Sequence, residues 1–155
     1  MYENLVKDNK EILLELAREK YKEENPEGKD VPDLKWLMTL LLASDPVTKY
    51  IYENEVIRKR DRLSEGVNST SAKATEYNKA LGYWVQMTSQ YADNVSDAAT
   101  LKAFQDAGIK RVKWNTQKDG RVCEKCKARD GNIYPISSVP PKVHWGDRCY
   151  FTPVK

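Results

Sequence analysis

The most informative parts of this chain are two short stretches, RVCEKC at residues 121–126 and HWGDRC at residues 144–149. They contain all three cysteines and the only histidine of the 155 residues, namely Cys123, Cys126, His144 and Cys149. Thiolate sulfur and imidazole nitrogen are common ligands of tetrahedral zinc, and a CxxC pair lets two sulfurs hold one ion from a tight turn. The pattern therefore predicts a structural Zn²⁺ site formed by these four side chains.

A disulfide framework, a redox motif and a set of core thiols fit these cysteines less well. A disulfide framework needs an even number of cysteines and a secreted protein, whereas the number here is odd and residues 1–4 lack the succession of a signal peptide. A thioredoxin-like CxxC is disfavoured because the rest of that fold does not follow in the sequence. Ordinary core thiols are disfavoured by charged neighbours such as Arg121, Glu124 and Lys125.

The region before residue 108 predicts helices. Apolar side chains recur at helical spacing within residues 5–21, 34–42, 47–57 and 77–91. Breakers separate these segments at Asn25-Pro26, at Ser44-Asp45-Pro46 and across residues 64–71. We expect Asp33 to cap the second helix, and Ser96 to cap a fifth helix over residues 97–106 that Gly108 ends.

After Gly108 the pattern changes to short β segments. Residues 109–116, 132–136 and 149–154 are rich in β-branched and aromatic side chains. We therefore predict an α+β fold, with an N-terminal helical region over residues 1–107 and a small zinc-stabilised β-rich module over residues 108–155. A core of that size supplies only ~3–5 kcal/mol, whereas zinc binding is worth about 10–16 kcal/mol in model peptides. The metal is thus expected to hold the module together.

Charge divides at the same boundary. Residues 108–155 carry 11 Lys or Arg and 4 Asp or Glu, a net of +7, whereas residues 1–107 carry a net of −4. This asymmetry suggests different partners for the two regions. The longest apolar run, near Leu40–Ala43, is too short to span a bilayer, so no membrane contact is expected.

A zinc-ribbon-like nucleic-acid-binding module is the alternative function. Basic side chains interleaved with Trp114 and Tyr134 suit contacts to phosphates together with stacking on bases. The candidate residues are Lys110, Arg111, Lys113, Arg121, Lys125, Lys127 and Arg129. The same residues also suit a structural role, because a zinc ion bound by three thiolates and a neutral imidazole carries a net charge of −1 that nearby cations offset.

Catalysis is not expected. A catalytic zinc keeps one coordination position open, and four candidate ligands leave none. Zinc deaminases use a His-x-Glu pair, whereas His144 is followed by Trp145 and Gly146. We therefore predict a structural protein and no enzymatic activity.

The module also carries an ordered series of short motifs. They are WNTQKDGRVCEKC at residues 114–126, Arg129-Asp130-Gly131, Pro140-Pro141, His144, Arg148-Cys149 and Pro153-Val154. This series resembles the C-terminal module of the phage Mu F-like minor head proteins, also called phage head morphogenesis proteins. The family pattern runs W-x-T-x-x-D-x-R-V-C-x-x-C, D-G, P-P, H-P-x-C-R-C and P-V, and the resemblance covers under a third of the chain.

One departure from the family pattern concerns the metal ligands. Asp147 stands where the family has the first cysteine of H-P-x-C-R-C, and Cys149 stands where it has the second. Carboxylates also bind zinc, so Asp147 is an alternative ligand in place of His144.

The resemblance implies a minor capsid protein that takes part in head morphogenesis of a phage or prophage. It further implies a place inside the virion head, after assembly in the host cytoplasm. The implied partners are portal, scaffold or capsid proteins, and contact with DNA is compatible with that role.

Overall fold

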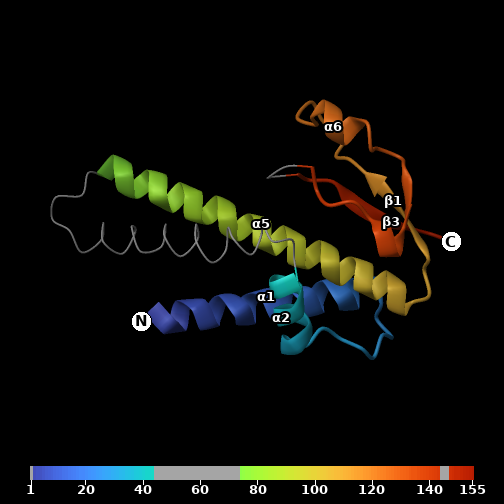
Figure 1. Ribbon diagram of the computed structural model, residues 1–155, viewed down its shortest axis with the longest axis horizontal. Coiled ribbons are helices and arrows are strands. Elements are labelled where there is room, and N and C mark those ends of the chain that lie inside the picture. The colour runs from blue at the N-terminus through green and yellow to red at the C-terminus, as the bar shows by residue number, and fades with distance from the viewer. Residues whose placement is uncertain (1, 44–73, 144–146) are drawn as a thin grey trace.

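A computed structural model describes residues 2–43, 74–143 and 147–155, and it confirms the α+β fold class (Figure 1). The helices are α1 (Tyr2–Glu24), α2 (Leu34–Ala43), α5 (Ala74–Asp106) and the short α6 (Glu124–Lys127). The strands are β1 (Arg111–Asn115), β2 (Ile133–Pro135) and β3 (Tyr150–Val154), and a 3₁₀ turn covers Ile136–Ser138. The helix expected over residues 47–57 lies outside the described residues.

Helix α1 ends, and helix α2 begins, where the sequence predicts. Helix α1 stops at Glu24, directly before Asn25-Pro26, where a turn forms with a hydrogen bond of 3.0 Å from the Gly28 N–H to the Asn25 carbonyl. Asp33 caps α2, since its Oδ1 accepts a hydrogen bond of 2.7 Å from the Trp36 N–H. A side-chain cap of this kind satisfies one of the N–H groups that a helix start leaves without an internal partner.

The expected break at Ser96 is wrong, because α5 runs without interruption from Ala74 to Asp106. Val95, Ala99 and Ala103 are all fully buried, so a stripe with a period of four residues continues past Ser96. The chain between residues 91 and 107 contains neither glycine nor proline to stop the helix. Packing of this stripe on α1 outweighs the local preference of Ser96 for a cap.

Gly108 ends α5 as predicted. Its φ angle of 79° lies in the left-handed region that favours glycine. The Ile109 N–H donates to the Phe104 carbonyl at 2.9 Å, and the Gly108 N–H donates to the Gln105 carbonyl at 3.0 Å. This pair of bonds is the Schellman motif, which satisfies the last carbonyls of the helix and turns the chain toward β1.

Helices α1 and α5 lie side by side and run in the same direction, with α2 packed against them (Figure 1). Small residues let the helices approach closely, and the core consists of Ala17, Leu37, Val95 and Ala99. A polar contact joins the C-terminal ends of α1 and α5, where the hydroxyl of the fully buried Tyr21 donates to Asp106 at 2.8 Å. We call this arrangement the helical core.

The three strands form an antiparallel sheet in the order β2-β1-β3, so the predicted β segments are confirmed with shorter bounds. Alternation along β1 buries Val112 and Trp114 and exposes Arg111 and Lys113. The inner face packs into a second core, and its buried members are Phe104, Val112, Trp114, Cys126, Cys149 and Phe151. Phe104 belongs to α5, so this helix contributes to both cores and the sheet lies against its C-terminal part (Figure 1).

Among the described residues, none of the helices combines the length and the apolar character needed to cross a bilayer.

Candidate metal centre

The first cysteine pair lies at the start of α6, beside the sheet. Cys123 is the N-cap of this helix, and its sulfur accepts the backbone N–H of Cys126 at 3.4 Å. The sequence predicted a tight turn here, and the structure refines it to a single helical turn. Backbone N–H groups aimed at a sulfur stabilise its thiolate form, which is the form that binds metals.

The second segment enters β3. Cys149 directly precedes this strand and continues its alternation, because Cys149 and Phe151 are buried while Tyr150 between them is exposed. Asp147 is also buried, with only 4 % of its surface exposed. Since side chains two residues apart share one face of a strand, this segment directs Cys149 toward the inner face of the sheet and α6.

The two segments bring a thiol and carboxylate cluster together. The ligand atoms of Cys126, Asp147 and Cys149 all lie within 4.8 Å of one another, and all three residues are buried. Cys123 lines the same cavity, which has a volume of about 20 Å³. The described part of the chain contains no disulfide between the three cysteines. His144 lies outside the described residues.

This cluster fits a metal ion. Ligand atoms around a tetrahedral zinc are about 3.5–4 Å apart, given Zn–S bonds of about 2.3 Å, and the corresponding atoms here lie within 4.8 Å of one another. The cavity holds about one water-sized sphere, which matches a single bound ion. Two buried thiols and a buried carboxylate also form a donor set typical of a metal site.

Asp147 organises the loop that precedes β3. One carboxylate oxygen accepts the Cys149 N–H at 2.8 Å, and the other accepts the Val143 N–H at 3.0 Å. The second oxygen also lies 3.5 Å from the Cys126 sulfur, which links the loop to α6. Asp147 therefore both shapes its own loop and faces the cysteines.

The acid–base properties of the cluster favour a cation. Burial raises the pKa of the Cys126 thiol, and hydrogen bonds to Cys123 and Cys149 together with the negative charge of Asp147 raise it further. Burial and Asp147 likewise raise the pKa of Cys149, against a lowering contribution from the Trp114 N–H. Burial alone would raise the pKa of Asp147, but hydrogen bonds from Cys149 and Val143 outweigh it and lower that pKa. A divalent cation reverses the penalty on the thiolates, because it supplies the missing positive charge.

Two cationic side chains brace the site from outside. Arg148 donates to both carboxylate oxygens of Asp119, at 2.8 and 2.7 Å, and so joins the loop before α6 to the loop before β3. Lys142 forms an ion pair of 3.2 Å with Asp97 on α5 and donates to the carbonyls of Asp147 and Cys149. Lys142 thereby connects the loop that carries Asp147 and Cys149 to helix α5.

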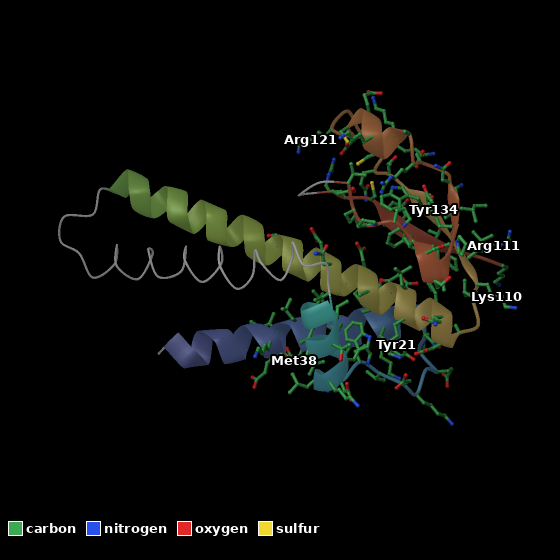
Figure 2. The ribbon with its side chains drawn as sticks, in the orientation of Figure 1. Tyr21, Met38, Lys110, Arg111, Arg121 and Tyr134 are labelled. Carbon is green, nitrogen blue, oxygen red and sulfur yellow. The ribbon has the colours of Figure 1, made fainter. Side chains whose placement is uncertain are left out.

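The seven basic residues proposed for nucleic-acid contact occupy different parts of the module. Arg121 lies at the end of the module away from Lys110 and Arg111 (Figure 2). Lys125 and Lys127 are exposed on α6, and Lys127 pairs with Glu124 at 2.8 Å. Arg111 and Lys113 lie on the outer face of the sheet.

Arg129 has a structural position instead. Its guanidinium lies 5.1 Å from the centre of the Trp114 ring and donates to the Pro141 carbonyl at 2.8 Å. These contacts hold the loop that follows α6 against the sheet core. Of the seven residues, Arg129 is thus the one whose guanidinium makes the clearest stabilising contacts within the module.

Sequence reasoning missed Lys142 and the cap position of Cys123. Lys142 has no local signal, because its partner Asp97 lies 45 positions earlier in the sequence. The cap at Cys123 had a weak signal, since Glu124 follows it and an acidic residue is favoured in the first turn of a helix.

Comparisons with known proteins do not identify the chain. No protein-family model, no curated protein and no solved structure matches it.

Proposed function

We propose that residues 108–155 bind one structural Zn²⁺ ion and that the ion fixes the shape of this module. Cys123, Cys126 and Cys149 would supply thiolates, with His144 as the fourth ligand and Asp147 as the alternative. The observation that carries the proposal is the buried cluster in which Cys126, Asp147 and Cys149 meet from two separate segments of the chain. The bound ion supplies positive charge and cross-links these segments.

Zinc is the best match among common metals for this donor set. Thiolates select zinc or iron–sulfur clusters over magnesium and calcium, which prefer sites made of oxygen atoms alone. A small cavity with room for about one ion favours a single zinc over a cluster. Because protein side chains can fill all four positions, we propose a structural ion and no catalysis.

We further propose that the chain is a minor head protein of the phage Mu F-like type, acting in head morphogenesis. The ordered motif supports this proposal, and several of its residues have physical roles around the site. Trp114 fills the sheet core, Asp119 pairs with Arg148, and Asp130 accepts the Thr116 N–H at 2.8 Å. The proposed location is inside the virion head after assembly in the host cytoplasm, with portal, scaffold or capsid proteins as partners.

The metal proposal is tested by elemental analysis of the full chain purified without added zinc. The expected result is about one zinc per chain, falling close to zero in Cys126→Ser and Cys149→Ser. Lys125→Ala, in the same short helix, is the matched control and should keep its zinc. Equal metal content in all four proteins would sink the proposal.

The head proposal needs a separate experiment. Co-purification of the tagged chain with the portal, scaffold and capsid proteins encoded beside it tests the partners. Mass spectrometry of purified virions tests the location. Absence of the chain from virions, together with failure to bind any of those proteins, would contradict the head role while leaving the zinc site untouched.

Exposed basic side chains on the outer face of the sheet support nucleic-acid binding as a second candidate function. Arg111 and Lys113 lie on this face and form no ion pair within the described residues. The register places Ile133 on one side of Lys113 and Thr152 on the other, and the three strands contain no acidic residue. Tyr150 is 45 % exposed next to this pair and could stack on a base.

This second candidate is tested with a single-stranded oligonucleotide and fluorescence anisotropy at several salt concentrations. The Arg111→Ala/Lys113→Ala double variant should bind more weakly, and its salt slope should fall by about 0.7 for each phosphate that the variant no longer neutralises. The control Lys125→Ala/Lys127→Ala removes the same charge from α6 and should bind like the unchanged protein. An equal decrease in affinity in both variants would show that only net charge matters and would overturn the assignment of the sheet face.

A further inference from the structure

The ring nitrogen of Trp114 is the one buried side-chain nitrogen or oxygen in the described residues that lacks a hydrogen-bond partner. Trp114 is fully buried in the middle strand of the sheet. A buried N–H without an acceptor is uncommon in native proteins, and each instance calls for a physical reason. An apolar ring of similar size would avoid the free-energy cost of burying an N–H without an acceptor. The presence of tryptophan therefore suggests that the N–H has a partner in some state of the protein.

The strand register places Trp114 next to the metal cluster. Trp114 pairs with Phe151 across β1 and β3, and their ring centres are 5.2 Å apart. Cys149 lies two residues before Phe151 and on the same face, so it is the diagonal neighbour of Trp114. Trp114 and Cys149 also belong to the same buried core. The Cys149 sulfur is therefore the acceptor that the indole can reach.

The Trp114 ring is held in place from three sides. The Arg129 guanidinium lies over the ring at 5.1 Å, while Phe151 and Tyr134 meet it edge to face, with Tyr134 at 6.2 Å between centres. The direction of the ring N–H is thus set by packing before any metal binds. Such preorganisation is what an outer-sphere group around a metal needs.

We propose that the indole N–H of Trp114 donates a hydrogen bond to the Cys149 sulfur when that sulfur is a metal-bound thiolate. Trp114 is then a positioning residue that orients Cys149 and offsets part of its charge. A neutral thiol is a weak acceptor, whereas a thiolate is a strong one, so the weak contact between the indole and the Cys149 thiol strengthens into a hydrogen bond as the ion binds. This inference rests on the proposed metal site.

Cadmium is a direct probe, because it replaces zinc in thiolate sites and ¹¹³Cd has a nuclear spin. A hydrogen bond from the indole to a cadmium-bound sulfur should give a scalar coupling between the indole proton and ¹¹³Cd. We expect a ¹H–¹¹³Cd correlation at the indole proton of Trp114 in the full, ¹⁵N-labelled chain. The resonance is assigned by its disappearance in Trp114→Phe.

A pair of variants separates this hydrogen bond from simple packing. Trp114→Phe removes the N–H, whereas Phe151→Leu trims the same core and leaves the N–H in place. Both variants should lose thermal stability. Zinc affinity, measured by chelator competition on the folded proteins, should fall about 10-fold in Trp114→Phe only, as expected when an outer-sphere partner is removed.

The outcomes distinguish this inference from the metal proposal. Cadmium binding with the expected correlation supports both. Cadmium bound by thiolates without a correlation, and with equal zinc affinity in the two variants, overturns the role of Trp114 and leaves the metal site standing. Failure of the unchanged chain to bind cadmium or zinc overturns the metal site and this inference with it.

Discussion

Asp147 combines two roles that can be separated by substitution. Its carboxylate accepts two backbone N–H groups and also faces the Cys126 sulfur. The same side chain thus braces its loop and belongs to a group of residues that could hold a metal ion. The Mu F-like pattern that the motif resembles has cysteine at this position, and a cysteine would not brace the loop in the same way.

Substituting Asp147 should therefore affect stability even when the metal is removed. Asp147→Ala leaves two N–H groups without their acceptor, and we expect a decrease of about 2–3 kcal/mol in the free energy of unfolding. Asp147→Asn keeps one carbonyl acceptor and should be less destabilised. Urea unfolding in the presence of a chelator measures both values. Equal destabilisation in the two variants would contradict the role of the loop brace.

Asp97 should make stability depend on pH. Burial raises its pKa to about 6, although Lys142 opposes this shift. Because the folded state binds this proton more tightly than the unfolded state, the contribution to stability is complete below a pH of about 3.8 and is lost as the pH rises through about 6. The contribution is at most about 2–3 kcal/mol.

The prediction for Asp97 is a difference between two pH profiles. Asp97→Asn should remove the decrease in stability between pH 4 and pH 6 while still accepting the hydrogen bond from Lys142. Asp119→Asn is the control with opposite sign, since hydrogen bonding to Arg148 lowers the pKa of Asp119. Its stabilising contribution is present above the ordinary pKa and disappears as the pH falls. Thermal unfolding from about pH 2.5 to about pH 7.5 measures all three proteins, and parallel profiles for wild type and Asp97→Asn would refute the assignment.

Two glycines differ in whether the structure has room for a side chain at their position. A Cβ at Gly28, in the turn after α1, would lie 2.5 Å from the hydroxyl of the buried Tyr21. A Cβ at Gly82, within α5, would meet nothing within 4 Å. The first glycine lets the turn close over Tyr21, whereas the second only weakens the helix.

Matched alanine substitutions test this contrast. Gly28→Ala should destabilise the protein by about 1–3 kcal/mol, because Tyr21 is held by Asp106 and cannot move away freely. Gly82→Ala should stabilise it by about 0.5–1 kcal/mol through helix propensity. Chemical unfolding measures both changes. A neutral Gly28→Ala would mean that the turn rearranges without cost.

The whole molecule consists of two cores that share α5. The helical core uses Val95 and Ala99, and the core of the sheet uses Phe104 one turn further on. The ion pair between Lys142 and Asp97 adds a polar link between the sheet module and the same helix. Packing on α5 therefore supports the sheet module independently of the proposed metal.

This shared helix predicts a graded response to metal removal. A chelator should increase hydrogen exchange more than about tenfold in residues 117–131, 142–143 and 147–149, which contain or adjoin the proposed ligands. Exchange in α1 and in the part of α5 that packs on it should change little, because that core contains no ligand. Hydrogen exchange followed by mass spectrometry, with and without chelator, measures this pattern. A uniform decrease in protection would indicate that the metal holds the entire fold.

Much of the local structure was predictable from the sequence. Asp33 and Gly108 marked helix ends correctly, because capping and the left-handed conformation depend on neighbouring residues. The β-branched and aromatic residues around Trp114 and Phe151 predicted strands correctly, because strand preference also depends on local residue types. The break at Ser96 failed, because the helix continues through packing on α1 that a local pattern does not contain.

The order of the elements and the set of candidate metal ligands could be read from spacing along the chain. Which of those residues meet in space could be seen only in the folded molecule. It placed Asp147 beside Cys126 and Cys149, separated Arg121 from Arg111, and brought Lys142 to Asp97. These are relations between distant segments, and their geometry depends on how α5 and the sheet pack, which no short stretch of sequence encodes.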